Sequence, residues 1–263
     1  MKEANIVEMQ QLGLQMLKEA IRICDSNRIP YFGCFGTVLG AVRHKGYIPW
    51  DHDTDICIPI DYMDTFVNVA KKELDKQFDI LAPCDSNNPV LFSRLCLKGH
   101  NSLVLHLDVY GLIGMPDEPN EQRKLLEKIN KLSNLYTIKK LFNSSSKPSK
   151  SLLQTIKSKL IKFYLLFFDV KRMENKHRKL SATFPFASSK AYCIPYPPVY
   201  GDRKIWKREM FGDGLLVDFE DIKIRIPQQY DAYLSQIYGD YLQYPPEEER
   251  NEMLNKKFII ENE

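Results

Sequence analysis

Two carboxylates separated by one residue are the side chains best suited to chemistry in this sequence. Asp53 and Asp55 begin a stretch, 53–60, in which alternate apolar residues predict a strand. Because side chains alternate along a strand, both carboxylates should point the same way and repel each other unless a cation lies between them. Oxygen ligands of this kind suit Mg²⁺, which takes one or two carboxylates together with phosphate oxygens and water. The pair therefore predicts a magnesium site.

A third acid occurs in a later stretch, 102–111, whose period-two pattern predicts another strand. Asp108 shares one face of this strand with His106 and Tyr110. Pairing beside the strand 53–60 would bring Asp108 to the same ions, as in phosphoryl-transfer sites that hold two metals. His106 is a candidate base for an acceptor hydroxyl. Two alternatives stay open, a hydrogen-bonded core histidine and Asp108 itself as the base.

A phosphate site is predicted just before the acidic pair. The aromatic run 31–35 predicts a short buried strand, and Gly36 and Thr37 then turn the chain into a helix through Arg43. Free amides at a helix start, the helix dipole and a threonine hydroxyl all favour an anion. Arg43 is a candidate for binding a donor phosphate, with stabilisation of its own helix end as the alternative.

Other charged residues near these stretches have two interpretations each. Arg94 and Lys98 lie on or just after a predicted strand, 90–97, where they could reach donor phosphates or simply be solvated. Asp51 is predicted to cap the turn before Asp53, with a supporting role near the metal as the alternative.

Five segments, in order, resemble the LicD family, to which the fukutin-related transferases are similar. They are Gly36-Thr37, Leu39-Gly-Ala-Val-Arg43-His-Lys-Gly46, Ile48-Pro-Trp-Asp-His-Asp-Thr-Asp55, His106-Leu-Asp-Val-Tyr110 and Tyr238-Gly-Asp-Tyr-Leu-Gln-Tyr-Pro-Pro246. The resemblance implies an α/β (α+β) fold with a nucleotidyltransferase-like mixed sheet and flanking helices. It also implies transfer of a phosphorylated alcohol, such as phosphocholine or a polyol phosphate, from a CDP-linked donor to a cell-surface glycan or its lipid-linked precursor.

The resemblance also assigns residues by position. It makes Asp53 and Asp55 the metal-binding pair, with Asp108 as the third carboxylate, and it implies Mg²⁺ or Mn²⁺ as the cofactor. The turn at Gly36 and Thr37 matches the phosphate-contacting turn. The sequence departs from the family at His52, where an acid is usual, and on a strand this side chain would point away from the metal pair.

Two other functions stay open. The first is a nucleotidyltransferase, which passes a nucleoside monophosphate to a small substrate and releases pyrophosphate. The second is a non-catalytic nucleotide- or glycan-binding module, which would require that the change at His52 mark a decayed metal site. The three intact aspartates at 53, 55 and 108 argue against the second.

Composition agrees with an intracellular enzyme. The chain of 263 residues is 44% hydrophobic, enough for a substantial core. The six cysteines lack metal-ligand spacing and are expected to be buried thiols in a reducing cytosol. The first residues lack the apolar region of a signal peptide. We expect a cytoplasmic protein, with the inner face of the cell membrane as a possible place of work.

The segment 122–180 is strongly basic, with sixteen Lys and Arg against three acids. The apolar run 161–168 lies within it and is too short to span a bilayer, which needs about 20 residues. One interpretation of 152–170 is an amphipathic helix that touches an anionic membrane. The other, slightly favoured, is a helical hairpin packed on a core. Nucleic acid is not an expected partner, because the basic segment lacks interleaved strand aromatics.

These patterns divide the chain into a catalytic core (1–121), a basic helical insertion (122–182) and a C-terminal part that completes the substrate site (183–263). Further elements are expected as scaffold: helices over 4–28 and 61–75, the latter capped by Asp61, a strand over 78–82, two short strands within 215–226, and a helix from Pro227 to Gly239. The charged tail from Glu247 is expected to fray.

Overall fold

The computed structural model describes residues 2–83, 85–100, 104–144, 168–196 and 198–260. The strands are β1 (Lys2–Ala4), β2 (Phe32–Gly33), β3 (Asp55–Pro59), β4 (Phe78–Leu81), β5 (Ser93–Leu97), β6 (His106–Met115), β7 (Ala191–Cys193), β8 (Ile205–Lys207), β9 (Leu215–Phe219), β10 (Ile222–Ile226) and β11 (Phe258–Ile260). The helices are α1 (Ile6–Ser26), α2 (Phe35–His44), α3 (Ile60–Glu73), α4 (Pro119–Ser144), α6 (Val170–Ser181), α7 (Tyr230–Tyr238) and α8 (Glu247–Leu254).

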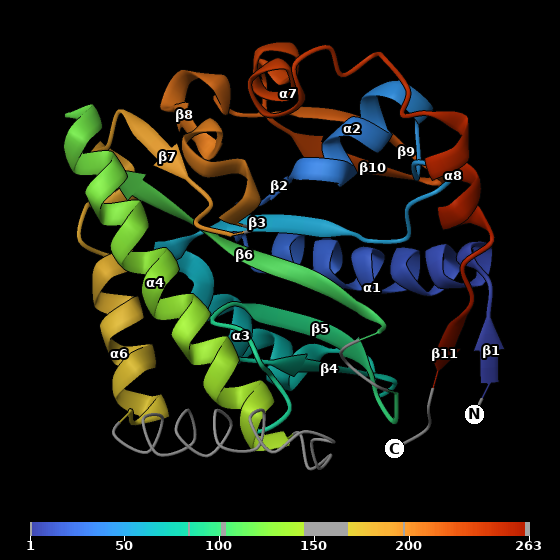
Figure 1. Cartoon of the computed structure of the whole chain (residues 1–263), viewed down its shortest axis with the longest axis horizontal. Helices are drawn as coiled ribbons and strands as arrows, with labels where there is room; N and C mark the ends of the chain where they lie inside the picture. The colour runs from blue at the N-terminus through green and yellow to red at the C-terminus, as the bar shows by residue number, and fades with distance from the viewer. Residues whose placement is uncertain (1, 84, 101–103, 145–167, 197, 261–263) are drawn as a thin grey trace, which may run out of the picture.

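A mixed sheet of seven strands forms the centre of the molecule (Figure 1). Its order is β2, β3, β6, β5 and β4, with β7 added to β6 and β8 added to β7. Among the described strands of this sheet, β3 and β6 run parallel and the other pairs are antiparallel. This arrangement confirms the predicted mixed sheet with flanking helices.

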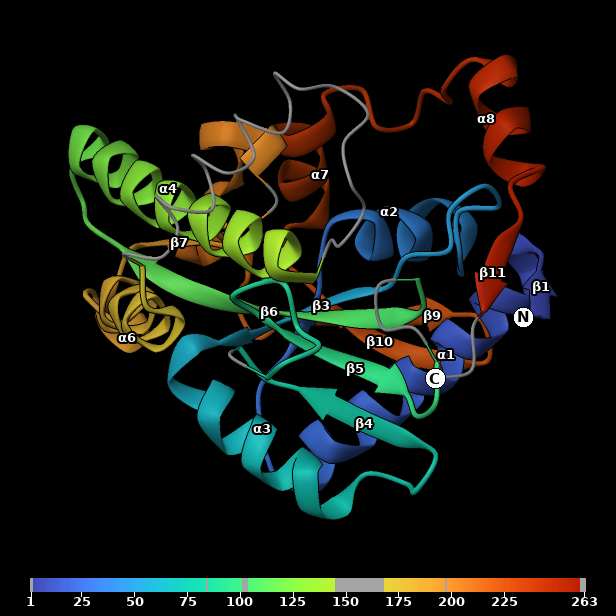
Figure 2. The ribbon, with the colours of Figure 1, turned by 60° about the horizontal axis from the view of Figure 1, so that its bottom comes forward.

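Helices α1 and α3 lie together on one face of the sheet (Figure 2), where α1 contacts β5 and β6 and α3 contacts β3, β4 and β6. Asn5 sets the start of α1, because its side chain accepts from the Glu8 amide while the Glu8 carboxylate accepts from the Asn5 amide. The stripe predicted for the helix over 4–28 is buried, including Met9, Met16 and Leu17. That prediction is confirmed, within two residues at each end.

Two boundaries near the acidic pair differ from the prediction. The strand begins at Asp55 rather than at residue 53, and α3 begins at Ile60 directly after it. Pro59 occupies the N-cap position and makes no side-chain cap, so the expectation that Asp61 caps this helix is wrong. The strand is short because its buried apolar run starts only at Ile56, and residues 51–54 form a loop.

The described part of the basic insertion is a pair of packed helices, α4 and α6, which lie side by side in Figure 1. Tyr136 of α4 and Met173 of α6 share a small apolar cluster, against which Phe168 packs. This part matches the hairpin interpretation. Residues 145–167, which carry most of the expected membrane-contacting helix, lie outside the described residues. Within the described parts of the chain, no helix is both long and apolar enough to cross a bilayer.

The C-terminal part joins the same sheet through β7 and β8 and buries Trp206 and Phe211 in the main core, 0% and 1% exposed. The predicted strands within 215–226 and the helix end at Gly239 are present, although α7 begins at Tyr230 rather than at Pro227. The tail from Glu247 does not fray as expected. It forms α8 and then β11, which pairs antiparallel with β1.

The cysteines that the structure describes, at positions 24, 34, 57, 96 and 193, are buried and lie outside any disulfide within the described residues. Cys84 lies outside the described residues. The prediction of buried thiols rather than disulfides is therefore confirmed for these five.

Candidate active site

The register of the two parallel strands places Asp55 directly opposite Asp108. Adjacent strands lie about 4.8 Å apart, and in-register side chains of a parallel pair point to the same face. Asp55 is the first residue of β3, just before the run Ile56–Ile58, which is 0% exposed. The predicted pairing of these two strands is confirmed, and it brings the third carboxylate beside the second.

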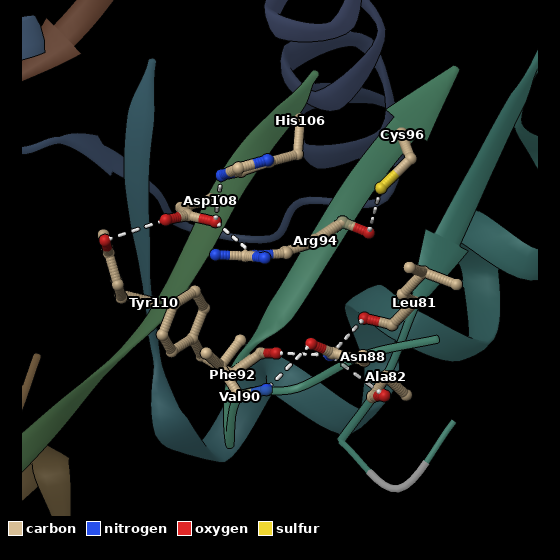
Figure 3. Close-up of polar contacts among 10 residues, drawn as sticks. All are labelled: Leu81, Ala82, Asn88, Val90, Phe92, Arg94, Cys96, His106, Asp108 and Tyr110. Carbon is tan, nitrogen blue, oxygen red and sulfur yellow. Dashed lines mark hydrogen bonds and ion pairs between the residues drawn. The ribbon is translucent and has the colours of Figure 1, made fainter. Parts of the chain in front are cut away.

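Asp108 is held by three neighbours (Figure 3). Its Oδ1 accepts from Nε of Arg94 at 2.9 Å and lies 3.4 Å from Nε2 of His106, and its Oδ2 accepts from the Tyr110 hydroxyl at 3.0 Å. Arg94 is the register partner of Asp108 on β5, and both side chains are shielded, 11% and 13% exposed. The interpretation of Arg94 as a solvated residue is therefore wrong. Lys98, just beyond β5, is exposed.

Asp51, His52 and Asp53 lie on the loop before β3. Oδ1 of Asp51 accepts from the Asp53 amide at 3.1 Å, which confirms the predicted turn cap. Nε2 of His52 lies 3.4 Å from Oδ1 of Asp53, and its ring packs on Phe258 with centroids 4.3 Å apart. The expectation that His52 points away from Asp53 is wrong, because these residues are not in a strand. Ligand atoms of the three loop residues lie within 4.8 Å of one another.

Helix α1 packs against this loop and holds it by hydrogen bonds. Nε2 of Gln10 donates to the Asp51 carbonyl at 2.7 Å, and the hydroxyls of Tyr47 and Thr54 are 2.8 Å apart. Gly13 of α1 permits that approach, since a Cβ there would lie 2.7 Å from the Tyr47 oxygen. The loop that carries Asp53 is therefore held at both ends by named contacts.

We call Asp51, Asp53, Asp55 and Asp108 the carboxylate cluster. Burial raises the pKa of Asp55 well above its usual range, and the charges of Asp108, Asp53 and Asp51 raise it further, against the opposing effect of Arg94. Burial and the Asp53 charge also raise the pKa of Asp51. A set of hard oxygen donors that repel one another fits a bound divalent cation, which would relieve this repulsion.

Thr37 ties the turn of α2 to β3. Its hydroxyl oxygen accepts from the Asp55 amide at 2.8 Å, and its own amide donates to the Cys34 carbonyl at 3.1 Å. The side chain is 2% exposed. In this structure Thr37 thus positions the backbone of Asp55, and its predicted contact with a phosphate stays a prediction.

Gly36 is the residue of this turn that lies open toward the cluster. A Cβ at Gly36 would meet one atom within 4 Å, Oδ2 of Asp51 at 3.2 Å. The Phe35 amide is already used by the Tyr233 hydroxyl at 3.1 Å. The Phe35 and Thr37 amides are used by these bonds, so the Gly36 amide between them is the candidate of this turn for binding an anion.

Arg43 fastens the closing segment 238–246 to the end of α2. Its guanidinium donates to the Tyr241 carbonyl at 2.9 Å and lies over the Tyr244 ring, 4.7 Å from the centroid. Burial lowers its pKa. The closing segment thus packs on α2, and contact of Arg43 with a donor phosphate stays a prediction.

Two tyrosines from the C-terminal part face the cluster, Tyr200 and Tyr238, of which Tyr238 begins the closing segment 238–246, although neither was predicted as a catalytic or metal-binding residue. The hydroxyls of Tyr200 and Tyr238 are 3.5 Å apart. Burial raises the pKa of both, and the charges of Asp55 and Asp51 raise both further. Tyr200 also stacks on Phe35, with centroids 5.4 Å apart. Only the sheet topology brings these rings to the acidic side of β3.

Comparison with known proteins agrees with this geometry. Residues 28–90, which contain the Gly36 turn and the loop acids, match the family model described as LicD/FKTN/FKRP, nucleotidyltransferase domain. The chain is 28% identical to the lipopolysaccharide cholinephosphotransferase LicD of Haemophilus influenzae over 95% of this chain and 96% of that protein.

Two further matches are shorter. An uncharacterized protein of Rickettsia typhi is 45% identical over 22% of this chain and 19% of its own length, and one of Rickettsia prowazekii is 48% identical over 17% and 16%. The match to Haemophilus LicD covers 95% of this chain and so includes Asp108 and the closing segment. Together with the family model over residues 28–90, it makes this chain similar to the LicD family of transferases along most of its length.

Proposed function

We propose that this protein transfers a phosphorylated alcohol, of the phosphocholine or polyol phosphate type, from a CDP-linked donor to a glycan or its lipid-linked precursor. The observation that carries the proposal is the pairing of Asp55 with Asp108 in a chain that aligns along 95% of its length with a lipopolysaccharide cholinephosphotransferase. A glycan acceptor built on a lipid would put this work at the inner face of the cell membrane.

The carboxylate cluster would hold the cofactor, with Asp53, Asp55 and Asp108 as ligands and Asp51 beside them. Mg²⁺ is the ion that this oxygen set favours, and Mn²⁺ is the alternative. When bound, the ion would neutralise negative charge on the donor phosphates and on the departing nucleotide.

The remaining roles fall to the chain itself. The Gly36 amide would bind a phosphate oxygen, and Thr37 would keep Asp55 in place through its backbone. His106 would take the proton of the acceptor hydroxyl, since its Nε2 stands 3.4 Å from Asp108. Arg94 positions Asp108. No covalent intermediate is needed, because the acceptor oxygen displaces the nucleotide directly.

The test is release of CMP by the purified protein. CDP-choline, CDP-ethanolamine, CDP-glycerol and CDP-ribitol are supplied with Mg²⁺, with and without a lipopolysaccharide acceptor, alongside Asp55→Asn. We expect acceptor-dependent CMP release with one donor and its loss in the variant. CMP release that Asp55→Asn leaves unchanged would contradict the proposal.

Nucleotidyl transfer is the second candidate, because the matched family model is named as a nucleotidyltransferase domain. In nucleotidyl transfer the leaving group is pyrophosphate, whereas in the proposed reaction it is CMP. Pyrophosphate release from a nucleoside triphosphate, in place of CMP release from a CDP-alcohol, would favour it. Binding of these nucleotides with neither product formed would favour a non-catalytic module.

A further inference from the structure

A cavity of about 600 Å³ lies between α3 and α6, apart from the carboxylate cluster. We call it the α3–α6 cavity. Its walls come from α3, α6, the loop 82–92, the outer half of β6 and residues 194–196. No residue of the carboxylate cluster lines it. The volume falls within the range of about 300–1,000 Å³ that is usual for small-molecule sites.

Several buried polar atoms in the lining of this cavity have no hydrogen-bond partner among the described residues. They include Oγ of Ser93 on β5, and Nε2 of His177 and Oγ of Ser181 on α6. Each is sealed from bulk solvent and has no hydrogen-bond partner among the residues that the structure describes. Ser93 and Ser181 are each 1% exposed. A buried polar group without a partner is destabilising, so several such groups around one cavity indicate an occupant that satisfies them.

The wall beside Ser93 is rigidly built (Figure 3). Asn88, 0% exposed, donates to the carbonyls of Ala82 at 3.1 Å and Phe92 at 2.8 Å, and accepts from the Val90 amide at 3.2 Å. This side chain braces the loop 82–92 from within. The cavity is therefore a formed space between braced walls.

Charge around the cavity excludes an anionic occupant. The lining contains the carboxylates of Asp61, Asp64 and Glu174 against a single guanidinium, that of Arg178, which is paired with Asp64 at 3.0 Å. Burial lowers the pKa of His177 to about 4, so its imidazole is neutral at pH 7. A phosphate or nucleotide would meet uncompensated negative charge there. The acidic lining contrasts with the basic segment around it.

The remaining lining is apolar and aromatic. Phe92, Tyr110 and Tyr196 contribute rings, with the Phe92 centroid 4.6 Å from that of Tyr110 and 5.0 Å from that of Tyr196. Flat apolar rings together with scattered neutral hydroxyl and imidazole groups are the surroundings that suit a ring or chain with many hydroxyls.

We propose that the α3–α6 cavity is a second binding site, for a neutral, hydroxyl-bearing organic molecule of about the size of a monosaccharide or a short polyol. Ser93, His177 and Ser181 bind its hydroxyls, and the aromatic walls cover its apolar face. The site is separate from the carboxylate cluster and stands whether or not that cluster transfers phosphate.

The test is direct binding to the purified full chain, by saturation-transfer NMR and titration calorimetry. The probes are glucose, galactose, N-acetylglucosamine, ribitol and glycerol, each neutral, with glucose 6-phosphate as the anionic match for glucose. We expect at least one neutral probe to bind with a Kd of roughly 1 mM or tighter, and glucose 6-phosphate to bind more weakly than glucose. Asp55→Asn should bind the same probe unchanged.

Two variants from opposite walls locate the bound probe. Ser181→Leu fills the cavity and should weaken binding at least tenfold. Ser93→Ala removes one hydroxyl with little risk to folding and should weaken binding by about threefold to tenfold, as expected for one hydrogen bond. Circular dichroism and thermal unfolding verify that each variant is folded.

Three results would overturn the proposal. One is that no neutral probe binds at about 100 mM, which would leave the cavity as a water-filled packing space. The second is that glucose 6-phosphate binds as well as glucose. The third is that folded Ser93→Ala and Ser181→Leu both bind the probe as the wild type does, which would place the probe elsewhere.

Discussion

The carboxylate cluster and the α3–α6 cavity adjoin the same strand, β6, but differ in what their buried polar atoms lack. In the cluster, both oxygens of Asp108 have hydrogen-bond partners, but the carboxylates repel one another. In the cavity, buried polar atoms of Ser93, His177 and Ser181 lack hydrogen-bond partners among the described residues. Tyr110 belongs to both, since its hydroxyl binds Asp108 while its side chain lines the cavity. The first site calls for a cation and the second for a neutral molecule.

The largest effect should come from removing the guanidinium of Arg94, which pairs with Asp108 of the cluster. Arg94→Met leaves Asp108 buried without its partner, and breaking a buried ion pair on one side costs about 3–5 kcal/mol of unfolding free energy. The expected fall in Tm is about 6–20 °C. Lys98→Met, an exposed lysine just past the same strand, is the control and should change stability by less than about 0.5 kcal/mol. A loss below about 1 kcal/mol in Arg94→Met would mean that the pair is not desolvated.

The next effect is on turnover. Asp55→Asn should lower kcat for CMP release by about 100-fold or more, because it removes a ligand for the ion that offsets developing charge. Asp79→Asn, an exposed carboxylate on β4 of the same sheet, should leave kcat unchanged. Measured under saturating donor and Mg²⁺, equal rates for both variants would remove Asp55 from the chemistry.

The next prediction concerns the pH dependence of stability that Asp55 of the carboxylate cluster causes. The pKa of Asp55 is raised in the folded protein, so the folded state binds this proton more tightly than the unfolded chain, whose aspartate pKa is about 3.9. Without divalent cations, wild type should therefore lose stability relative to Asp55→Asn as the pH rises above about 4. Denaturant titrations from pH 4 to 8 measure the difference in unfolding free energy between the two proteins. Mg²⁺ should reduce this difference at pH 7. A difference independent of pH would contradict a raised pKa for Asp55.

The smallest expected effect is on stability, when one hydroxyl group is removed from each site and the two losses are compared. Tyr110→Phe removes a hydrogen bond to a charged group and should cost about 1.5–3 kcal/mol. Ser93→Ala removes a hydroxyl that has no partner within the described residues, and should change stability by less than about 0.5 kcal/mol or increase it. Equal losses from urea unfolding of the two variants would erase the contrast between the sites.

Much of the scaffold could be predicted from sequence because its elements have a clear apolar periodicity or end at residues such as glycine. The apolar stripe of α1, the glycine after α7 and the buried run of β3 all lie where the pattern indicated. The prediction that Asp108 stands beside Asp55 succeeded because the strands that carry them pair in register, Asp55 opposite Asp108.

The errors have a common cause, which is that sequence pattern does not report contacts between distant segments. Asp53 looked like a strand residue because it alternates with Asp55, but no neighbouring strand pairs with residue 53. Arg94 looked solvated until the register of β5 placed it against Asp108. The tail from Glu247 is charged, yet β11 within it finds β1 at the other end of the chain. Tyr200 and Tyr238 reach the cluster only through the packing of the C-terminal part.

The pairing of β1 with β11 has a consequence for biosynthesis. Phe258 of β11 packs on His52, which lies against Asp53, so the His52 ring receives its cover from a residue made about 200 positions later. At a translation rate of roughly 5–20 residues per second, a ribosome would leave this ring uncovered for about 10–40 seconds. A nascent chain stalled before β11 should therefore have a formed central sheet but a His52 ring open to solvent.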